Sequence, residues 1–318
     1  MPFFKMDASG RIAASLNDNS SPHNRAFTMR RVAKRKKICH AVSMPDTTYS
    51  LDLEAYFARI GYAGPRVPTL ETLHAITGHQ AATIPWESLD VLLGRPISLD
   101  PAAVERKLIH ERRGGYCFEQ NQLLLLVLQA IGFRVTPLSA RVRWQRPKNV
   151  ISARTHLFVR VELAGETWIT DLGVGGVSLT AAIRLHEAGE QRTPHDARRI
   201  VREEQCYVHQ VRFDREWLDV CEFTGEEMPV IDRELANWWT SASPQSRFRQ
   251  TMGVARGGLD GSRRTLRDRE FTCRFPDGRV EQRTIATPEE LLQTLAEEFG
   301  LHFPAGTRFG PPGSPWPS

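Results

Sequence analysis

The stretch from Arg113 to Asn121 constrains this chain more than any other part of its sequence. Its pair of glycines permits a tight backbone path that a Cβ atom would block. The apolar run Leu123–Leu128 follows directly and indicates a buried helix that ends near Gly132. Cys117 is therefore expected at the start of a helix, where free N–H groups and the helix dipole favour a thiolate. The alternative interpretation is a small core cysteine beside a turn.

A thiolate nucleophile needs a base, and the base needs a group that orients it. The residues after His156 alternate between apolar and polar, as in a half-buried strand. Asp171 closes a second predicted strand, just before a glycine turn, where it could accept a hydrogen bond from an imidazole. Together with Cys117 these residues would form a set for acyl transfer. Taken singly, His156 could equally be a core histidine and Asp171 a turn-former.

Several motifs occur in an order that resembles the arylamine N-acetyltransferases. The resemblance begins near Tyr56 and covers most of the chain after about Pro45. Its segments are Tyr56–Tyr62, Ile84–Leu89, Arg113–Asn121, Arg154–His156, Thr170–Gly176 and Ser243–Phe248. The backbone N–H of Cys117 is the expected donor to an oxyanion, and the second donor stays unidentified.

The resemblance implies an α+β fold with an N-terminal helical bundle, a central antiparallel β-barrel and a C-terminal α/β lid around a cysteine-protease-like core. It also implies acetyl-CoA as the donor co-substrate, an aromatic amine or hydrazine as the acceptor, and ping-pong transfer through an acetyl-cysteine. No metal is expected. Beyond Cys117, His156 and Asp171, the residues that it places at the substrates are Trp86 and Phe248 in the acceptor pocket, Thr155 beside the histidine, and Gly173, Gly175 and Gly176 beside the donor.

The chain departs from the family pattern at three positions. Trp86 and Ser88 stand where the family usually has Phe and Asn, and Val174 stands where it often has Phe. A larger Trp86 should narrow the acceptor pocket, so we expect a preference for small, flat amines. The spacing of the glycine turn does not match a dinucleotide-binding fingerprint.

Composition and periodicity, together with the resemblance, lead us to expect four segments. These are a disordered basic leader (1–45), a helical bundle with the nucleophilic cysteine (46–132), a β-barrel with His156 and Asp171 (133–228), and a linker helix with an α/β lid (229–318), of which the linker and the lid are implied by the resemblance. The leader holds a dense run of Lys and Arg between Arg30 and Lys37. It could instead be a transit peptide or a nucleic-acid patch, or translation could begin at Met44.

Local signals predict the elements inside these segments. Helices are expected over 51–64, from Thr69, from Asp100 to Gly114, over 232–241 and over 288–299. Strands are expected around 139–144, after His156, before Asp171, at 206–208 and at 211–213, with a hairpin turn at 276–278.

The cysteine count, the net charge and the lengths of the apolar runs exclude some classes of protein. Five cysteines without a CxxC pair indicate reduced thiols in a cytoplasmic enzyme and no zinc finger. No apolar run approaches the roughly 18 residues of a membrane span, and a net charge of +5 gives no reason to expect a nucleic-acid face. The sequence leaves monomer and homodimer open.

Two rival functions share the same residues. A peptidase or transglutaminase-like enzyme would use a Cys–His–Asp set without CoA, and a non-catalytic homologue could keep only the pocket. Arg113 and Glu119, which flank Cys117, are expected to form a structural ion pair or cap, with a contact from Arg113 to a CoA phosphate as the alternative.

Overall fold

The first helices begin at polar caps and follow the predicted apolar spacing. In the computed structural model, which describes residues 49–213 and 215–310, α1 spans Leu53–Ile60 and α2 spans Leu70–Thr83. The side chain of Asp52 accepts the Ala55 N–H (2.9 Å), and Thr69 caps α2 in the same way (3.2 Å). Residues 61–64 lie outside α1, because Gly61 takes a left-handed conformation that ends the helix.

The third predicted helix is only partly α-helical. It begins after Asp100 with Pro101 at its first position, as predicted, and α4 spans Pro101–Glu105. From Arg106 to His110 the chain continues as a π-helix, η1, a change that apolar periodicity does not reveal. The Cys117 helix, α5, spans Cys117–Ala130 and is buried except near its C-terminal end, where Gln129 and Ala130 are exposed, so it is a central element of the fold.

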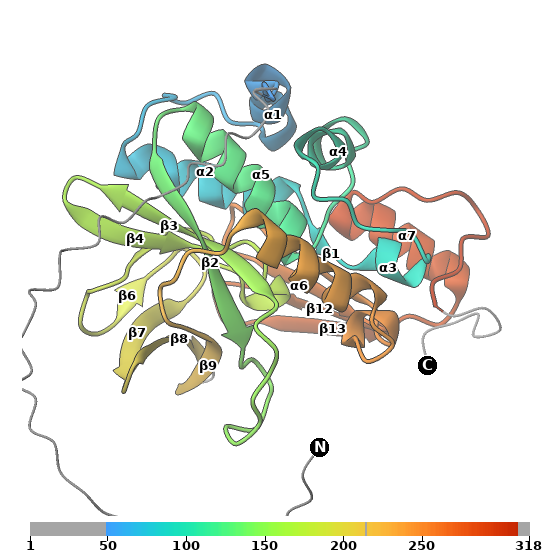
Figure 1. Ribbon diagram of the computed structural model, residues 1–318. Helices are drawn as coiled ribbons and strands as arrows, with labels where there is room; N and C mark the ends of the chain where they lie inside the picture. Colours follow the sequence, from blue (N-terminus) through green and yellow to red (C-terminus); the bar gives the residue numbers. More distant parts are fainter. Residues whose placement is uncertain (1–48, 214, 311–318) are drawn as a thin grey trace, which may run out of the picture. The chain divides into compact units, whose positions relative to one another are not determined.

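An eight-stranded antiparallel sheet follows and curls until it is nearly closed (Figure 1). The strand order is β5-β4-β3-β2-β9-β8-β7-β6. The strands are β2 (Arg134–Val142), β3 (His156–Leu163), β4 (Glu166–Thr170), β5 (Ile183–Arg184), β6 (Gln191–Arg192), β7 (Ala197–Glu203), β8 (Cys206–Phe213) and β9 (Glu216–Phe223). Helix α5 contacts β2 and β3, which brings the start of α5 beside the start of β3.

Two of the predicted strands are in fact one. The runs 206–208 and 211–213 belong to β8, whose pairing with β9 shifts register between His209 and Gln210. This irregularity interrupts the alternation of buried and exposed residues, so the sequence pattern predicts two short strands instead of one. Strands β7 and β9 were not predicted, because charged residues are interspersed through both.

A second, five-stranded sheet has the order β1-β10-β11-β12-β13. The predicted turn at 276–278 joins its last two strands. The strands are β1 (Trp86–Glu87), β10 (Gly253–Gly257), β11 (Arg263–Arg267), β12 (Glu270–Arg274) and β13 (Val280–Thr284). The first strand comes from the N-terminal part of the chain and pairs with β10, so this sheet connects the Trp86 segment to the C-terminal part. That connection between distant segments was not predicted.

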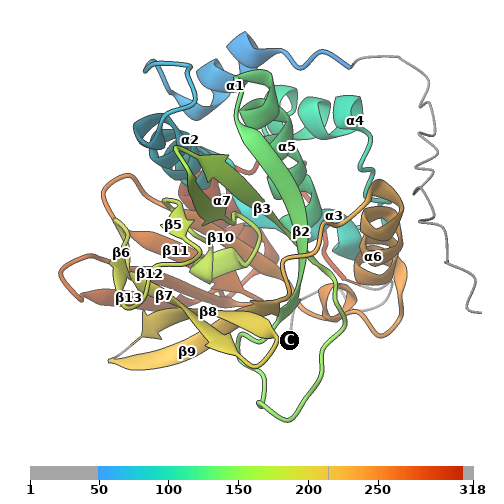
Figure 2. The same cartoon turned by 60° about the vertical axis from the view of Figure 1, so that its left-hand side comes forward.

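Two longer helices, α6 and α7, follow the strands of the first sheet and the last strand of the second sheet, respectively (Figures 1 and 2). Helix α7, Pro288–Phe299, has the predicted Thr287 cap and Gly300 stop. Helix α6, Val230–Ala242, extends the predicted helix by a few residues. Short helices α3 (Leu89–Leu92), η2 (Gly175–Val177) and η3 (Arg247–Arg249) complete the chain.

The described residues combine helices and antiparallel sheets, which confirms the mixed α+β class. The predictions for the leader, including Met44 and the basic run, and for the last residues, 311–318, lie outside the described part of the chain. In that part, no helix is both long enough and apolar enough to cross a membrane.

Candidate active site

Cys117 is the first residue of α5, and its position is fixed by the turn before it. Glu119 reaches back and accepts the N–H of Tyr116 (3.1 Å), which caps the helix. Gly114 lies so close to the preceding strand that a Cβ there would be 2.1 Å from the Pro85 carbonyl oxygen. The glycine is therefore required by packing, as the sequence indicated.

His156 and Asp171 form a fully buried pair beside Cys117. The Nε2 atom of His156 lies 2.7 Å from the Asp171 Oδ2 atom, and both side chains are almost inaccessible to solvent. The Sγ atom of Cys117 lies 3.8 Å from the carbonyl oxygen of Thr155, the residue before His156. Because the Nε2 atom of His156 bonds to Asp171, its Nδ1 atom is the ring nitrogen that can exchange a proton with the Cys117 thiol.

Asn121, one turn along α5 from Cys117, connects the pair to the nucleophile helix. Its Nδ2 donates to Asp171 Oδ1 (3.1 Å) and to the carbonyl oxygen of Leu157 (2.7 Å). Its Oδ1 accepts the backbone N–H of Leu172 (3.0 Å). The side chain therefore joins α5, β3 and the end of β4 through three hydrogen bonds.

The electrostatics of the pair favour a charged imidazole. Burial by itself lowers the pKa of His156, but the charge and hydrogen bond of Asp171, aided by Cys117, raise it to about 10. Burial works against the Asp171 carboxylate too, yet the His156 charge and bonds from Gly173 and Asn121 hold its pKa below the usual range. The site is therefore arranged for an imidazolium–carboxylate pair at neutral pH.

A cavity of about 780 Å³ opens onto Cys117. It is lined by Cys117, His156 and every predicted substrate-binding residue, namely Trp86, Thr155, Phe248, Gly173, Gly175 and Gly176. Asp171 does not line it and lies behind His156. The structure thus brings the predicted residues together, with the carboxylate shielded from the cavity.

Trp86 and the glycine turn pack against each other in the wall of this cavity. The Trp86 Nε1 donates to the Gly173 carbonyl oxygen (2.9 Å), and its ring lies 5.7 Å from that of Phe248. A Cβ atom at Gly173 would lie 2.5 Å from the Cβ atom of Cys117, so only glycine allows this turn to approach the nucleophile.

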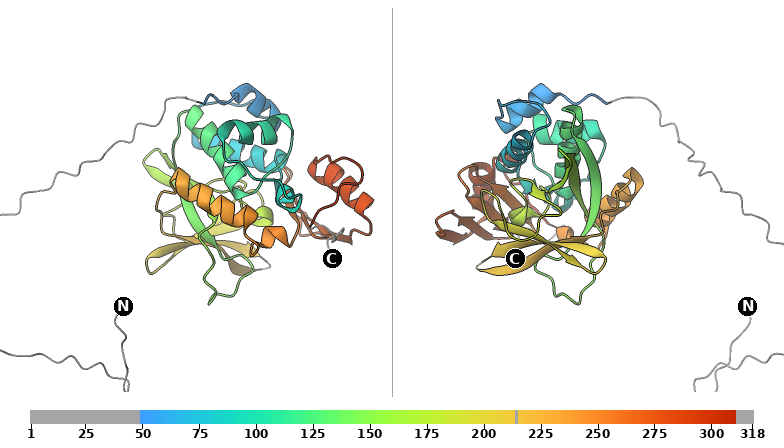
Figure 3. Two further views of the ribbon diagram at one scale, coloured as in Figure 1. Left: turned by 45° about the vertical axis from the view of Figure 1, so that its right-hand side comes forward. Right: turned by 90° about the vertical axis from the view of Figure 1, so that its left-hand side faces the viewer.

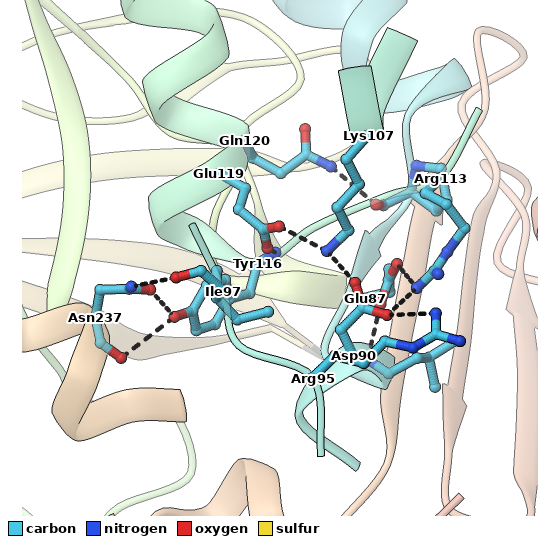
Figure 4. A network of polar contacts seen from close by, with 12 residues as sticks. Glu87, Asp90, Arg95, Ile97, Lys107, Arg113, Tyr116, Glu119, Gln120 and Asn237 are labelled. Atoms are coloured by element: carbon cyan, nitrogen blue, oxygen red, sulfur yellow. Dashed lines mark hydrogen bonds and ion pairs between the residues drawn. The ribbon is translucent and has the colours of Figure 1, made fainter. Parts of the chain in front are cut away.

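A buried network of charges surrounds Lys107 and Arg113 and includes Glu119, near the start of α5 (Figure 4). Lys107 on η1 bridges Asp90 (2.7 Å) and Glu119 (2.6 Å). Arg113 pairs with Glu87 (2.7 Å) and Asp90 (3.1 Å). Arg113 is only 8% exposed, which supports the structural interpretation, although its partners differ from Glu119.

The glycine turn is held from its other end by a second buried network. The guanidinium of Arg198, on β7, donates to the carbonyl oxygens of Val177 (2.9 Å) and Ser178 (3.3 Å). Arg263, on β11, also donates to Ser178 (3.0 Å), and both arginines bind the Asp196 carboxylate. This network fixes the turn between the two sheets.

Sequence reasoning missed the residues that support the site. Asn121 was visible as a polar residue in a run that becomes apolar, a signal for a buried partner. Lys107 and Arg198 gave no comparable signal, since their partners are far away in sequence. In the described chain, no group of three or more His, Cys, Asp or Glu side chains could hold a metal ion.

Comparison with known proteins defines the class first. A family model described as N-acetyltransferase matches residues 69–307. Arylamine N-acetyltransferase of Escherichia coli (strain K12) is 40% identical over 249 residues, which cover 78% of this chain and 88% of that protein. The arylamine N-acetyltransferase of Mycobacterium bovis is 36% identical over 258 residues, 80% and 90% of the two chains.

Solved structures agree with these relatives. The arylamine N-acetyltransferase from Salmonella typhimurium has a TM-score of 0.75 and 38% identity, and it aligns with 78% of this chain and 90% of its own. The Mycobacterium marinum enzyme in complex with CoA has a TM-score of 0.75 and 32% identity, over 78% and 92%. The chain therefore belongs to the arylamine N-acetyltransferase family, which confirms the resemblance seen in its motifs.

Proposed function

We propose that this protein transfers the acetyl group of acetyl-CoA to an aromatic amine or hydrazine through an acetylated Cys117. The observation that carries the proposal is the buried His156–Asp171 pair beside Cys117 at the end of a large cavity. Family membership supports the acceptor class, and the CoA complex of a related enzyme supports the donor.

The first half-reaction uses the thiol as nucleophile. In the resting enzyme His156 holds the proton of Cys117, and Asp171 stabilises this imidazolium beside the thiolate. The thiolate attacks the thioester carbonyl carbon, and the negative oxygen that forms accepts a hydrogen bond from the Cys117 backbone N–H at the start of α5. The bond between the carbonyl carbon and CoA sulfur then breaks, and CoA leaves with the proton from His156.

The second half-reaction returns the enzyme to its starting state. The amine nitrogen attacks the acetyl carbon of the thioester on Cys117, and His156 accepts the proton that the nitrogen loses. The Cys117 sulfur leaves as a thiolate. Because CoA departs before the amine reacts, the two substrates exchange in a ping-pong sequence.

Trp86 and Phe248 form the aromatic wall that we assign to the acceptor, and the turn at Gly173, Gly175 and Gly176 lies where the donor thioester would approach. Thr155 supports the site through its carbonyl beside the thiol. The described cysteines, Cys117, Cys206, Cys221 and Cys273, are all free, in keeping with a cytoplasmic enzyme.

Steady-state kinetics test the proposal. With acetyl-CoA and p-anisidine varied together, double-reciprocal plots should give parallel lines, and chromatography should detect N-acetylated amine. Cys117→Ser should abolish product, whereas Cys206→Ser, at a half-buried free cysteine outside the cavity, should not. Product formation by Cys117→Ser would contradict the proposal, and so would hydrolysis or cross-linking of peptides without CoA.

A further inference from the structure

Helix α6 carries the largest group of exposed apolar side chains in the described chain. Five of the eleven large hydrophobic residues that are exposed belong to it: Val230, Ile231, Leu235, Trp238 and Trp239. Ile231, Leu235 and Trp238 are 68%, 66% and 59% exposed. Their spacing of four and three residues puts them in one row on the helix, which we call the α6 stripe.

The α6 stripe has no cover within the described chain. In Figures 2 and 3 no helix or strand lies outside α6. The opposite face is anchored, because Ala236, Asn237 and Thr240 are buried and the Asn237 Nδ2 donates to the Ile97 carbonyl oxygen (2.9 Å). The helix is therefore fixed in place and presents a preformed apolar surface of a kind typical of protein interfaces.

The charges around α6 are divided between its two ends. Around the N-terminal end are four carboxylates and two guanidiniums: Glu226, Glu227, Asp232 and Glu234, with Arg154 and Arg233. Glu226 pairs with Arg154 (3.0 Å), while Glu227 has an exposed side chain that feels the charge of Arg233 but forms no ion pair among the described residues. At the C-terminal end, the Arg249 guanidinium donates to the Ala242 carbonyl oxygen (2.8 Å). Arg249 forms no ion pair with a carboxylate among the residues that the structure describes.

We propose that the α6 stripe binds the same stripe of a second copy of this chain, with the two helices antiparallel. A twofold axis near Leu235 puts Leu235 against its symmetry mate and Ile231 against Trp238 of the partner subunit. It also brings Glu227 of each subunit toward Arg249 of the other, twice in one interface. A single arrangement thus buries the exposed apolar row and pairs the exposed charges of Glu227 and Arg249.

The interface is expected to be weak. A helix of 13 residues is about 20 Å long, so a single pair of helices buries less than the roughly 1,200 Å² of a small stable interface. We therefore expect self-association in the micromolar range, which corresponds to a binding free energy of about −8 kcal/mol. Trp239, next to the stripe, lines the cavity, so the interface and the cavity share one helix.

Sedimentation velocity of the full chain over roughly 1–200 µM at low salt tests the proposal. The sedimentation coefficient should rise with concentration toward that of a dimer. Leu235→Glu should keep the protein monomeric, because it puts two carboxylates against each other. The matched control Leu259→Glu changes an equally exposed leucine (64%) in a loop and should leave self-association unchanged.

Charge reversal separates this arrangement from other contacts. Glu227→Arg and Arg249→Glu should each weaken self-association several-fold, and the double variant should restore it. A chain that stays monomeric at every concentration would overturn the proposal. Equal effects of Leu235→Glu and Leu259→Glu would also overturn it, and so would binding of lipid vesicles through the stripe by a monomer. None of these results depends on the acetyl-transfer proposal.

Discussion

Asn121 links the elements that carry Cys117, His156 and Asp171 through three hydrogen bonds. We predict that Asn121→Ala lowers kcat roughly 10- to 100-fold, because misplacing a catalytic pair by about 1 Å has effects of this size. The KM for acetyl-CoA should change little, since Asn121 is buried and does not line the cavity. Gln129→Ala, at an exposed position on the same helix, is the control. An unchanged kcat would show that Asp171 is held well enough by the Gly173 N–H.

Trp86 sets the shape of the aromatic wall. We predict that Trp86→Phe raises the ratio of kcat/KM for a bicyclic arylamine to that for a single-ring arylamine by roughly tenfold, the scale for added space in an apolar pocket. The variant also loses the bond to the Gly173 carbonyl oxygen, at a cost of about 1 kcal/mol.

Product assays with both amines, alongside Trp217→Phe, measure this ratio. Trp217 packs against the guanidinium of Arg199 and lies outside the cavity. A wild-type enzyme that already prefers bicyclic amines would show that Trp86 does not narrow the pocket.

At the scale of elements, the buried charges join η1, α3 and the start of α5. Lys107 is the centre of this network, and the carboxylates of Glu119, Glu87 and Asp90 outweigh burial and raise its pKa. We predict that Lys107→Met lowers the free energy of unfolding by about 3–5 kcal/mol, because it leaves the buried Glu119 carboxylate without a cationic partner. Urea unfolding measures this loss.

Two further variants control that experiment. Arg106→Met changes an exposed neighbour (its side chain is 66% exposed) and should cost little. The double variant Lys107→Met with Glu119→Gln should recover part of the loss, because the neutral amide still accepts the Tyr116 N–H. A single variant as stable as the wild type would mean that water or another residue replaces the lysine.

The elements that the sequence predicted best are those with local signals. Helix α7 begins after the Thr287 cap and ends at Gly300, and α4 begins after the Asp100 cap with Pro101 as its first residue. These limits were predictable because caps act within one turn. Strand β1 could not be foreseen, since two residues after a proline acquire strand structure only by pairing with β10. The roles of Arg198 and Lys107 could not be predicted either, because their partners belong to other elements of the fold.

The catalytic candidates were predictable for a different reason. Cys117, His156 and Asp171 lie at the ends of elements, and each belongs to a short motif with its own glycine or polar signal. Asn121 lies within the first motif, but its three partners became visible only when α5, β3 and β4 were assembled. The boundaries of the three predicted parts between residues 46 and 318, and the cysteine-protease-like core, stay predictions.

For the whole molecule, buried histidines predict sensitivity to acid. Burial, reinforced by the Arg198 charge, lowers the pKa of His209 to about 3. In the unfolded chain a histidine binds a proton below about 6.5. The native state is therefore destabilised as pH falls from about 6.5 to about 3, by about 1.4 kcal/mol per pH unit for each such histidine.

The variant His209→Gln isolates this effect. Between about pH 6 and pH 4.5, the slope of the unfolding free energy against pH should be smaller than in the wild type by about 1.4 kcal/mol per pH unit, which corresponds to the uptake of one proton on unfolding. His195, whose pKa burial and the Arg263 charge lower to about 4, contributes equally to both proteins. His302→Gln, at an exposed histidine, is the control. Identical slopes for the wild type and His209→Gln would contradict the burial argument.

The central claim is that the acetyl group resides on Cys117 between the two substrates. Intact-mass measurement after mixing the protein with acetyl-CoA, without any amine, tests it most directly. We predict a gain of roughly 42 Da that is absent in Cys117→Ser and disappears when an arylamine is added. An adduct that persists in Cys117→Ser would contradict the account, and so would amine acetylation by a wild-type enzyme that never carries the adduct.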